Sequence, residues 1–480
     1  MRSCILIFLF GSLLFFLPTT GTTQTADTTE VFTFSDYLEW VRTYHPMARR
    51  ADLLNRQAEA NQLAARGGFD PKLSADIDRK SFDGKRYFTV GEGALKIPSW
   101  FGAEFKMGYL WSDGIFLNPE NNLPINGQAV IGVKWSLGQG LFIDERRTAL
   151  QQARLLSQRN EAERRSMVNN LLLDASKSYW DWSFSVASLR IIEEAVRLAE
   201  QRFEAVRESY IQGASPAVDT LESFLQVQNR RQQQQEAVLV VTNTRQRLSN
   251  FLWYKNEIPL EVGLTLEPEN LEIWNPNIPP GTLSTPTQEL LMSHPDLQSY
   301  RFQLEQQQVD RRLKAEELKP RLDVEYNLLA NQFDFANRSN GSSDASWWNA
   351  VWTENYKLGV SFEFPLFLRK ERGKLQQADL KIRDTNFKYL NKRQELATYL
   401  DVYRQQLFNV QQQINLGRDM VVNYERLLEA ETEKFRIGES SIFLLNSREQ
   451  KLIESQTKVL KLKAHFQKLD AGYQWAAGTL

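Results

Sequence analysis

The hexapeptide YIQGAS at residues 210–215 has a counterpart, FRIGES, at residues 435–440. Upstream, LQQARL at residues 150–155 returns as LQQADL at residues 375–380, again 225 residues later. Two further matches lie nearer the N-terminus at an offset of 249 residues, and they are YHP (44–46) with SHP (293–295) and FDPKL (69–73) with LKPRL (318–322). Four matches, in order and in two constant registers, indicate a duplicated unit whose first copy carries about 24 additional residues.

Each copy is predicted to contain a helix, a region of β-strands and a long helical hairpin. Leu322, Val324 and Tyr326 alternate with polar residues, and this period of two predicts a strand with one apolar face. The excess of the first copy includes a similar run from Ala103 to Trp111, which predicts an additional hairpin near residues 86–112. The predicted divisions are a signal peptide at 1–24, a first repeat at 30–252, a proline-rich connector at 253–286 and a second repeat at 287–480. The first repeat is expected to contain a helix at 36–65, strands within 72–137 and a helical hairpin at 144–252. The second is expected to contain a helix at 288–318, strands within 321–364 and a helical hairpin at 369–476.

The long helices lack helix-breaking residues over an unusual length. Residues 144–211 contain no proline or glycine, and residues 374–437 contain only Gly417. At about 1.5 Å per residue, such a helix reaches roughly 100 Å. Apolar residues in both segments recur at alternating steps of four and three, which is the seam of a coiled coil. Gly213 and Gly438 then allow the positive φ of a chain reversal, so a second helix is expected to return alongside each first one.

The N-terminus has the pattern of an export signal. Arg2 precedes an apolar run from Ile5 to Leu17, and a small, polar stretch follows. Thirteen residues are too few to span a bilayer as a helix, so we expect a secretory signal peptide, with a buried N-terminal helix as the alternative. Cys4 is the only cysteine and lies in this segment, so the exported chain is expected to contain none.

The composition excludes several classes of protein. With 24% charged and 42% hydrophobic residues, the chain is too polar for a bundle of membrane helices and too apolar to be disordered. The formal net charge of −1 gives no reason to expect a nucleic-acid partner. There are only three histidines, and no phosphate-binding loop, zinc-protease or hydrolase motif occurs, so no metal, cofactor or catalytic site is predicted. His45 and His294 each precede a proline where a helix begins, which favours a structural role.

The alternating strands suggest a transmembrane β-barrel, with a soluble β-sandwich as the alternative. Tryptophans gather in the strand regions as interface girdles do, and they are Trp100, Trp111, Trp135, Trp347, Trp348 and Trp352. About four strands per chain cannot close a barrel, which needs about eight, and lipid excludes an open sheet edge. Three chains would supply about twelve strands. Entry of the additional hairpin into the wall is the less favoured alternative.

The order of these elements resembles the TolC family of outer-membrane efflux proteins. The matching features are the two His-Pro helix beginnings, the strand entries at Pro71 and Pro320, and the paired turns that follow Phe203 and Phe435. The resemblance covers nearly all of the mature chain and rests on order and duplication. It implies a homotrimer whose β-barrel lies in the lipid of the bacterial outer membrane and continues as a coiled-coil helical barrel through the periplasm. It also implies docking on a periplasmic adaptor protein of an inner-membrane pump, in a tripartite efflux or type I secretion system.

By this resemblance, the two glycine turns contact the adaptor. The residues assigned to docking are Tyr210, Gly213, Ala214, Ser215, Phe435, Gly438, Glu439 and Ser440. The alternative is that they form only helix turns.

A ring of carboxylates is predicted at the narrow end. Asp219 and Glu222 are three residues apart and share a helix face, and three copies would favour cations over anions. Charges on a wetted helix face are the alternative. The family often places acidic gate residues in the second copy, but the matching positions here are Leu444 and Ser447.

The resulting hypothesis is a passive export duct, without enzymatic activity, for drugs, metals or polypeptides. The competing hypothesis is an exported coiled-coil spacer or adhesin without a pore. The alternating strands favour the duct, because a spacer has no use for them.

Overall fold

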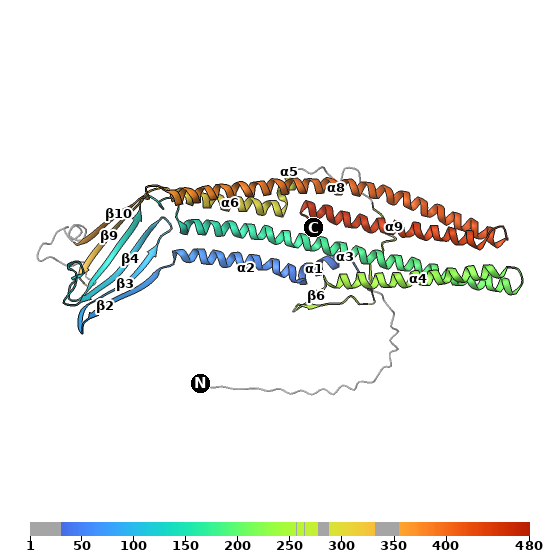
Figure 1. Cartoon of the computed structure of the whole chain (residues 1–480), viewed down its shortest axis with the longest axis horizontal. Helices are drawn as coiled ribbons and strands as arrows, with labels where there is room; N and C mark the ends of the chain where they lie inside the picture. Colours follow the sequence, from blue (N-terminus) through green and yellow to red (C-terminus); the bar gives the residue numbers. More distant parts are fainter. Residues whose placement is uncertain (1–29, 256, 264, 277–287, 332–354) are drawn as a thin grey trace, which may run out of the picture.

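The computed structural model shows an elongated molecule with a β-sheet at one end and long helices running away from it (Figure 1). The structure describes residues 30–255, 257–263, 265–276, 288–331 and 355–480. Trp347, Trp348 and Trp352 lie outside the described residues. Among the described helices, none is both long enough and apolar enough to cross a membrane.

The sheet is antiparallel and takes strands from both repeats. Its order is β10-β9-β5-β4-β3-β2, so the repeats join where β5 pairs with β9. The strands are β2 (Lys72–Phe82), β3 (Lys85–Pro98), β4 (Ala103–Asp113), β5 (Gln128–Ser136), β9 (Arg321–Asn331) and β10 (Tyr356–Glu363). Within the described residues this sheet has six strands, compared with the four or so that were predicted for the barrel wall of each chain.

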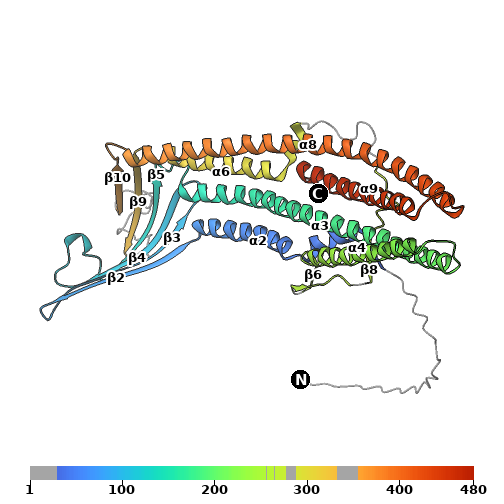
Figure 2. The same cartoon turned by 45° about the vertical axis from the view of Figure 1, so that its right-hand side comes forward.

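The additional hairpin predicted near residues 86–112 is present as β3 and β4 and belongs to this sheet. β4 lies between β3 and β5, and β3 pairs along its length with β2 (Figure 2). Only β4 of this hairpin shows the alternation in the sequence, because Gly91 and Gly93 of β3 occupy positions where apolar side chains would reveal it. At Gly91 the indole of Trp111 takes that space, since a Cβ at this position would lie only 2.1 Å from its Cζ2.

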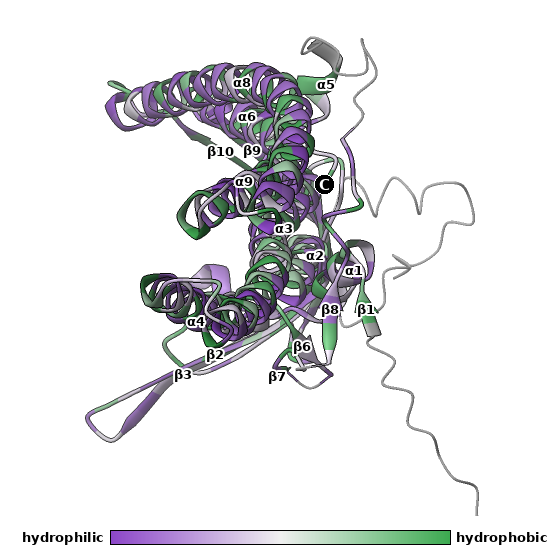
Figure 3. Cartoon of the chain, turned by 90° about the vertical axis from the view of Figure 1, so that its right-hand side faces the viewer, coloured by the Kyte–Doolittle hydropathy of each residue, from purple (hydrophilic) through white to green (hydrophobic). Residues whose placement is uncertain are grey.

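The helices form a curved wall, which is visible when the molecule is seen along its length (Figure 3). The predicted antiparallel hairpins are present, with α3 beside α4 and α8 beside α9. Two shorter helices, α2 and α6, lie along the halves of α3 and α8 nearest the sheet. The bounds are α1 (Phe34–Tyr44), α2 (Pro46–Arg66), α3 (Glu145–Ile211), α4 (Ala217–Ser249), α5 (Gln288–Ser293), α6 (Pro295–Glu316), α8 (Arg369–Arg436) and α9 (Ile442–Ala477).

The first helix of each repeat is broken at its His-Pro pair, where one continuous helix was predicted. His45 and His294 have extended ψ angles of 134° and 130° and act as N-caps. The Nδ1 of His45 accepts from the Met47 N–H at 3.1 Å, and that of His294 accepts from the Asp296 N–H at 3.2 Å. The structural role predicted for both histidines is therefore confirmed.

The largest apolar core lies midway along the helices. Tyr37 of α1 and Tyr179 and Trp182 of α3 are fully buried there, beside residues of the connector such as Leu271. This core fixes α3 at its centre and leaves both of its ends to extend.

The remaining elements are the parallel pair β1 (Glu30–Phe32) with β8 (Leu266–Pro268), the antiparallel pair β6 (Trp253–Tyr254) with β7 (Ile258–Pro259), and the short 3₁₀ turns η1 (Gly67–Phe69) and η2 (Pro119–Asn121).

Candidate functional site

The two turns far from the sheet have the same geometry. Gly213 and Gly438 have φ angles of +73° and +79°, which glycine adopts without the steric cost that a Cβ would add. The Ala214 N–H donates to the Ser209 carbonyl at 2.8 Å, and the Glu439 N–H donates to the Lys434 carbonyl at 2.8 Å. Each turn thus closes its helix in the same manner before the returning helix begins.

The structure places the predicted docking residues together at these two turns, at one end of the molecule (Figure 1). Tyr210 is 47% exposed, and Gly213, Ala214, Gly438 and Glu439 are also exposed. The remaining three predicted residues, Ser215, Phe435 and Ser440, are half-buried. The turns therefore present a largely open surface, and docking at that surface stays a prediction.

Asp219 and Glu222 lie in the first two turns of α4, directly after the first glycine turn. Both side chains are half-buried, and neither forms an ion pair with another described residue. Leu444, at the corresponding place in α9, is 42% exposed. Acidic side chains therefore accompany only the first of the two repeats at this position.

A buried charge cluster links the two helical hairpins and was not predicted. Arg230 of α4 and Glu449 of α9 are 1% and 2% exposed, and Arg202 of α3 also donates to the Glu449 carboxylate. The Arg230 Nη2 lies 3.7 Å from the Glu449 Oε1, and its Nη1 donates to Gln450 at 2.7 Å. Burial lowers the pKa of the Arg230 guanidinium. No sequence signal distinguishes these positions from the many exposed charges of a coiled coil.

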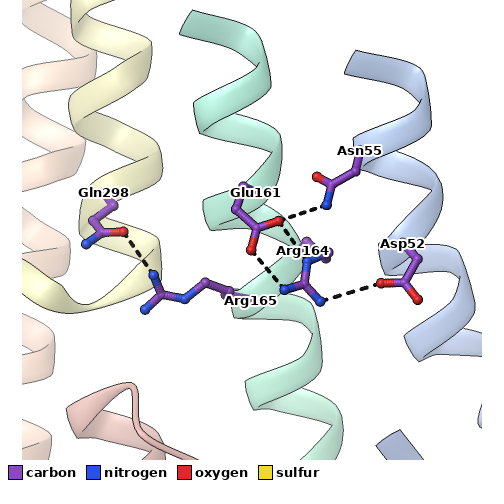
Figure 4. Close-up of polar contacts among 6 residues, drawn as sticks. All are labelled: Asp52, Asn55, Glu161, Arg164, Arg165 and Gln298. Atoms are coloured by element: carbon purple, nitrogen blue, oxygen red, sulfur yellow. Dashed lines mark hydrogen bonds and ion pairs between the residues drawn. The ribbon is translucent and has the colours of Figure 1, made fainter. Parts of the chain in front are cut away.

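A second polar network ties three helices together nearer the sheet (Figure 4). Arg164 and Glu161 of α3 pair at 2.8 Å, and Asn55 of α2 donates to the same carboxylate at 2.8 Å. The adjacent Arg165 donates to Gln298 of α6 at 3.4 Å. The hydrogen bond from Arg164 lowers the pKa of Glu161. This network holds α2 and α6 on either side of α3.

The connector is fastened to α9 by a buried lysine. The Nζ of Lys463, which is 4% exposed, donates to the carbonyls of Leu271 at 3.2 Å and Glu272 at 2.6 Å. A groove of about 760 Å³ beside it lies between α3, α8 and α9. His465, two residues along, is exposed.

The described tryptophans of the predicted girdle lie towards both ends of the strands. Trp135 pairs with Ala103 at the helix-proximal end of the sheet, and Trp100 is 78% exposed in the adjacent turn. Trp111 lies opposite Gly91, towards the far end. This placement is compatible with a girdle, which remains a prediction.

The described residues contain no cluster of histidine, cysteine or carboxylate side chains that could hold a metal ion. What the geometry offers is an amphipathic sheet joined to a curved helical wall. Such a structure can enclose a passage when copies are combined.

Known proteins share this architecture. A model of the outer membrane efflux protein family matches residues 124–252 and 287–468. No curated protein matches the sequence. Three solved outer-membrane proteins have the same fold, and each is 13% identical in sequence over 93% of this chain. The MtrE channel of Neisseria gonorrhoeae has a TM-score of 0.66 with 88% of its own chain covered, and the CmeC channel of Campylobacter jejuni has a TM-score of 0.64 with 85% covered. VceC of Vibrio cholerae has a TM-score of 0.62 with 96% of its chain covered.

Proposed function

The chain belongs to the outer membrane efflux protein family, and from this premise we propose how its parts carry out export. It is an outer-membrane efflux channel that extends into the periplasm. Its sheet forms part of a β-barrel and its long helices form part of a helical barrel. We propose that it works as a homotrimer and as a passive duct, without catalysis of its own.

The observation that carries this proposal is the incompleteness of the single chain. The sheet leaves β2 and β10 as open edges, and the helices form an arc rather than a closed tube (Figure 3). Lipid does not tolerate open edges, because their N–H and C=O groups would lack partners. Further copies of the chain satisfy those groups and close the arc.

The glycine turns are the proposed docking surface for a periplasmic adaptor, which in turn contacts an inner-membrane pump. Their support is their exposure, their matched geometry and their position at the end opposite the sheet. The pump supplies the energy. The Asp219 and Glu222 carboxylates, repeated in three copies, are the proposed cation-favouring constriction behind this surface.

Purified protein in a planar lipid bilayer tests the proposed duct. We expect stable conductance and a protein that detergent extracts from membranes but salt does not. The competing hypothesis, an exported coiled-coil spacer or adhesin, predicts no conductance and release by salt. That result would reject the duct.

A further inference from the structure

The strand register places apolar side chains on one face across the whole sheet. From one edge to the other, partners on this face include Leu73 with Leu95, Leu95 with Met107, and Met107 with Ile131. The face continues through Ile131 with Leu328, then Leu328 with Tyr356. The apolar face therefore extends without interruption from β2 to β10.

The opposite face carries charged pairs. The Nζ of Lys106 on β4 lies 2.5 Å from the Oε1 of Glu92 on β3. The Nζ of Lys134 on β5 lies 3.2 Å from the Oδ2 of Asp323 on β9. Asp78, on β2, belongs to this face because its neighbour Ile77 belongs to the other. β2 is thus as amphipathic as the strands of the second repeat, whereas β3 also carries Phe88, Val90 and Ala94 on this face.

No described helix covers the apolar face. The helices continue from one end of the sheet and do not pack over it (Figures 1 and 2). Leu73 and Ile77 of β2 are 83% and 64% exposed, and Leu358 and Val360 of β10 are 55% and 63% exposed. Both edge strands therefore leave their apolar side chains equally uncovered.

The dimensions fit the hydrocarbon layer. The apolar positions of β4 run from Ala103 to Trp111, and nine residues at about 3.3 Å each, tilted by about 45°, rise roughly 20 Å. The outward apolar band of outer-membrane barrels is about 25 Å tall. The strands of the first repeat are therefore long enough to cross the lipid.

The chain directions also permit closure. The six strands alternate in direction, so β2 and β10 run antiparallel to one another. An edge β2 of one copy can thus pair with the edge β10 of the next copy in the ladder that the rest of the sheet uses. A parallel arrangement would have broken that continuity.

We propose that all six strands of each chain, including β2 and β3, face the lipid, so that three copies build a wall of about eighteen strands closed by β2–β10 pairing. The inference rests on the homotrimer of the proposed function. It replaces the wall of about twelve strands that four strands per chain would give. Because barrel diameter grows roughly in proportion to strand number, the lumen at the membrane is about 1.5 times wider.

Single-cysteine labelling tests the proposal, since the chain has one cysteine, Cys4, which we replace with serine. The variants Ile77→Cys and Asp78→Cys probe the two faces of β2, and Val360→Cys and Ser361→Cys are the matched pair on β10. Each carries a fluorescent thiol label in vesicles of phosphatidylcholine, with or without brominated acyl chains. We expect bromine to quench the labels at residues 77 and 360 at least threefold more than those at 78 and 361.

The outcomes separate this inference from the proposed function. Quenching at residue 360 without quenching at residue 77 would overturn the eighteen-stranded wall and leave the duct intact. Absence of quenching at both residues would contradict the barrel itself, and with it the proposed function.

Disulfide cross-linking provides an independent measurement. Cysteine pairs between β2 and β10, scanned over Leu73, Ala75 and Ile77 against Val360, are expected to join neighbouring copies. The control pair, Met107→Cys with Val360→Cys, is expected not to do so. Cross-linking of the control pair alone would show that β4 is the true edge and would reject the proposal.

Discussion

The buried Glu449 carboxylate compensates two guanidinium groups from different helices. Removing one partner of a buried ion pair leaves an uncompensated charge, and this costs about 3–5 kcal/mol. We therefore expect Glu449→Gln to lower the local opening free energy of α4 and α9 by about that amount, as measured by native-state hydrogen exchange. The matched control is Glu204→Gln, since Glu204 pairs with Arg207 at an exposed site. This substitution should change the local opening free energy by less than about 1 kcal/mol. Equal effects of both variants would contradict this assignment.

His294 makes the stability of its helix junction depend on pH. Burial lowers the pKa of His294, an effect that Lys392 and Arg165 increase and that Asp296 opposes. The folded state therefore binds fewer protons than the unfolded state, so stability is fully present above the usual histidine pKa of 6.5 and is lost as the pH falls below it. Protonation would also remove the lone pair that accepts from the Asp296 N–H.

We expect the melting temperature of the wild-type protein to fall between pH 7 and pH 5 by more than that of His294→Asn. Asparagine can cap the helix without titrating. Thermal melts at a series of pH values measure the difference. The same slope of melting temperature against pH in both proteins would show that groups other than His294 determine the pH dependence of stability.

Asp219 offers the simplest test of the proposed constriction. Asp219→Asn removes one negative charge per chain from the narrow end, so the cation-to-anion permeability ratio should fall severalfold, as measured by reversal potentials in a salt gradient. Glu236→Gln, on the exposed surface of the same helix, is the charge-matched control and should leave the ratio unchanged. An unchanged ratio in Asp219→Asn would reject the ring.

At the scale of the element, β3 depends on a glycine that makes room for an aromatic ring. A side chain at Gly91 would overlap the Trp111 indole, whereas a side chain at Gly93 meets nothing within 4 Å. We expect Gly91→Val to reduce the yield of heat-resistant oligomers in membranes at least fivefold and Gly93→Val to preserve it. Assembly of both variants at wild-type levels would show that Trp111 can move aside.

The sequence allowed the long elements to be predicted, but not all of the sheet. The glycine turns, the paired helices and five of the six described strands of the sheet follow from periodicity and repetition. β3 shows no such alternation, because Gly91 and Gly93 lack the side chains that would reveal it, and its position follows only from the hairpin expected near residues 86–112. The Glu449 cluster was also beyond prediction, since burial of a coiled-coil charge depends on which helices become neighbours.

At the scale of the whole molecule, the turns should determine assembly with the adaptor. Glu439→Lys reverses a charge at the exposed second turn and should weaken co-purification with the adaptor at least tenfold, without altering conductance. Glu429→Lys, on the exposed surface of α8 before the turn, is the matched control. Undiminished capture of the adaptor by Glu439→Lys would remove this turn from the docking surface.

The uninterrupted course of α3 has a mechanical consequence. The helix is held at its middle by the aromatic core around Trp182, and about 29 residues, or roughly 44 Å, extend from there to its end at Ile211. That segment can tilt as a rigid helix about the point where the core holds it. A tilt of about 5° at the core displaces the end of α3 at Ile211 by roughly 4 Å. A rearrangement too small to disturb the central packing would therefore change the opening of the proposed helical barrel at the glycine turns by more than the width of a water molecule.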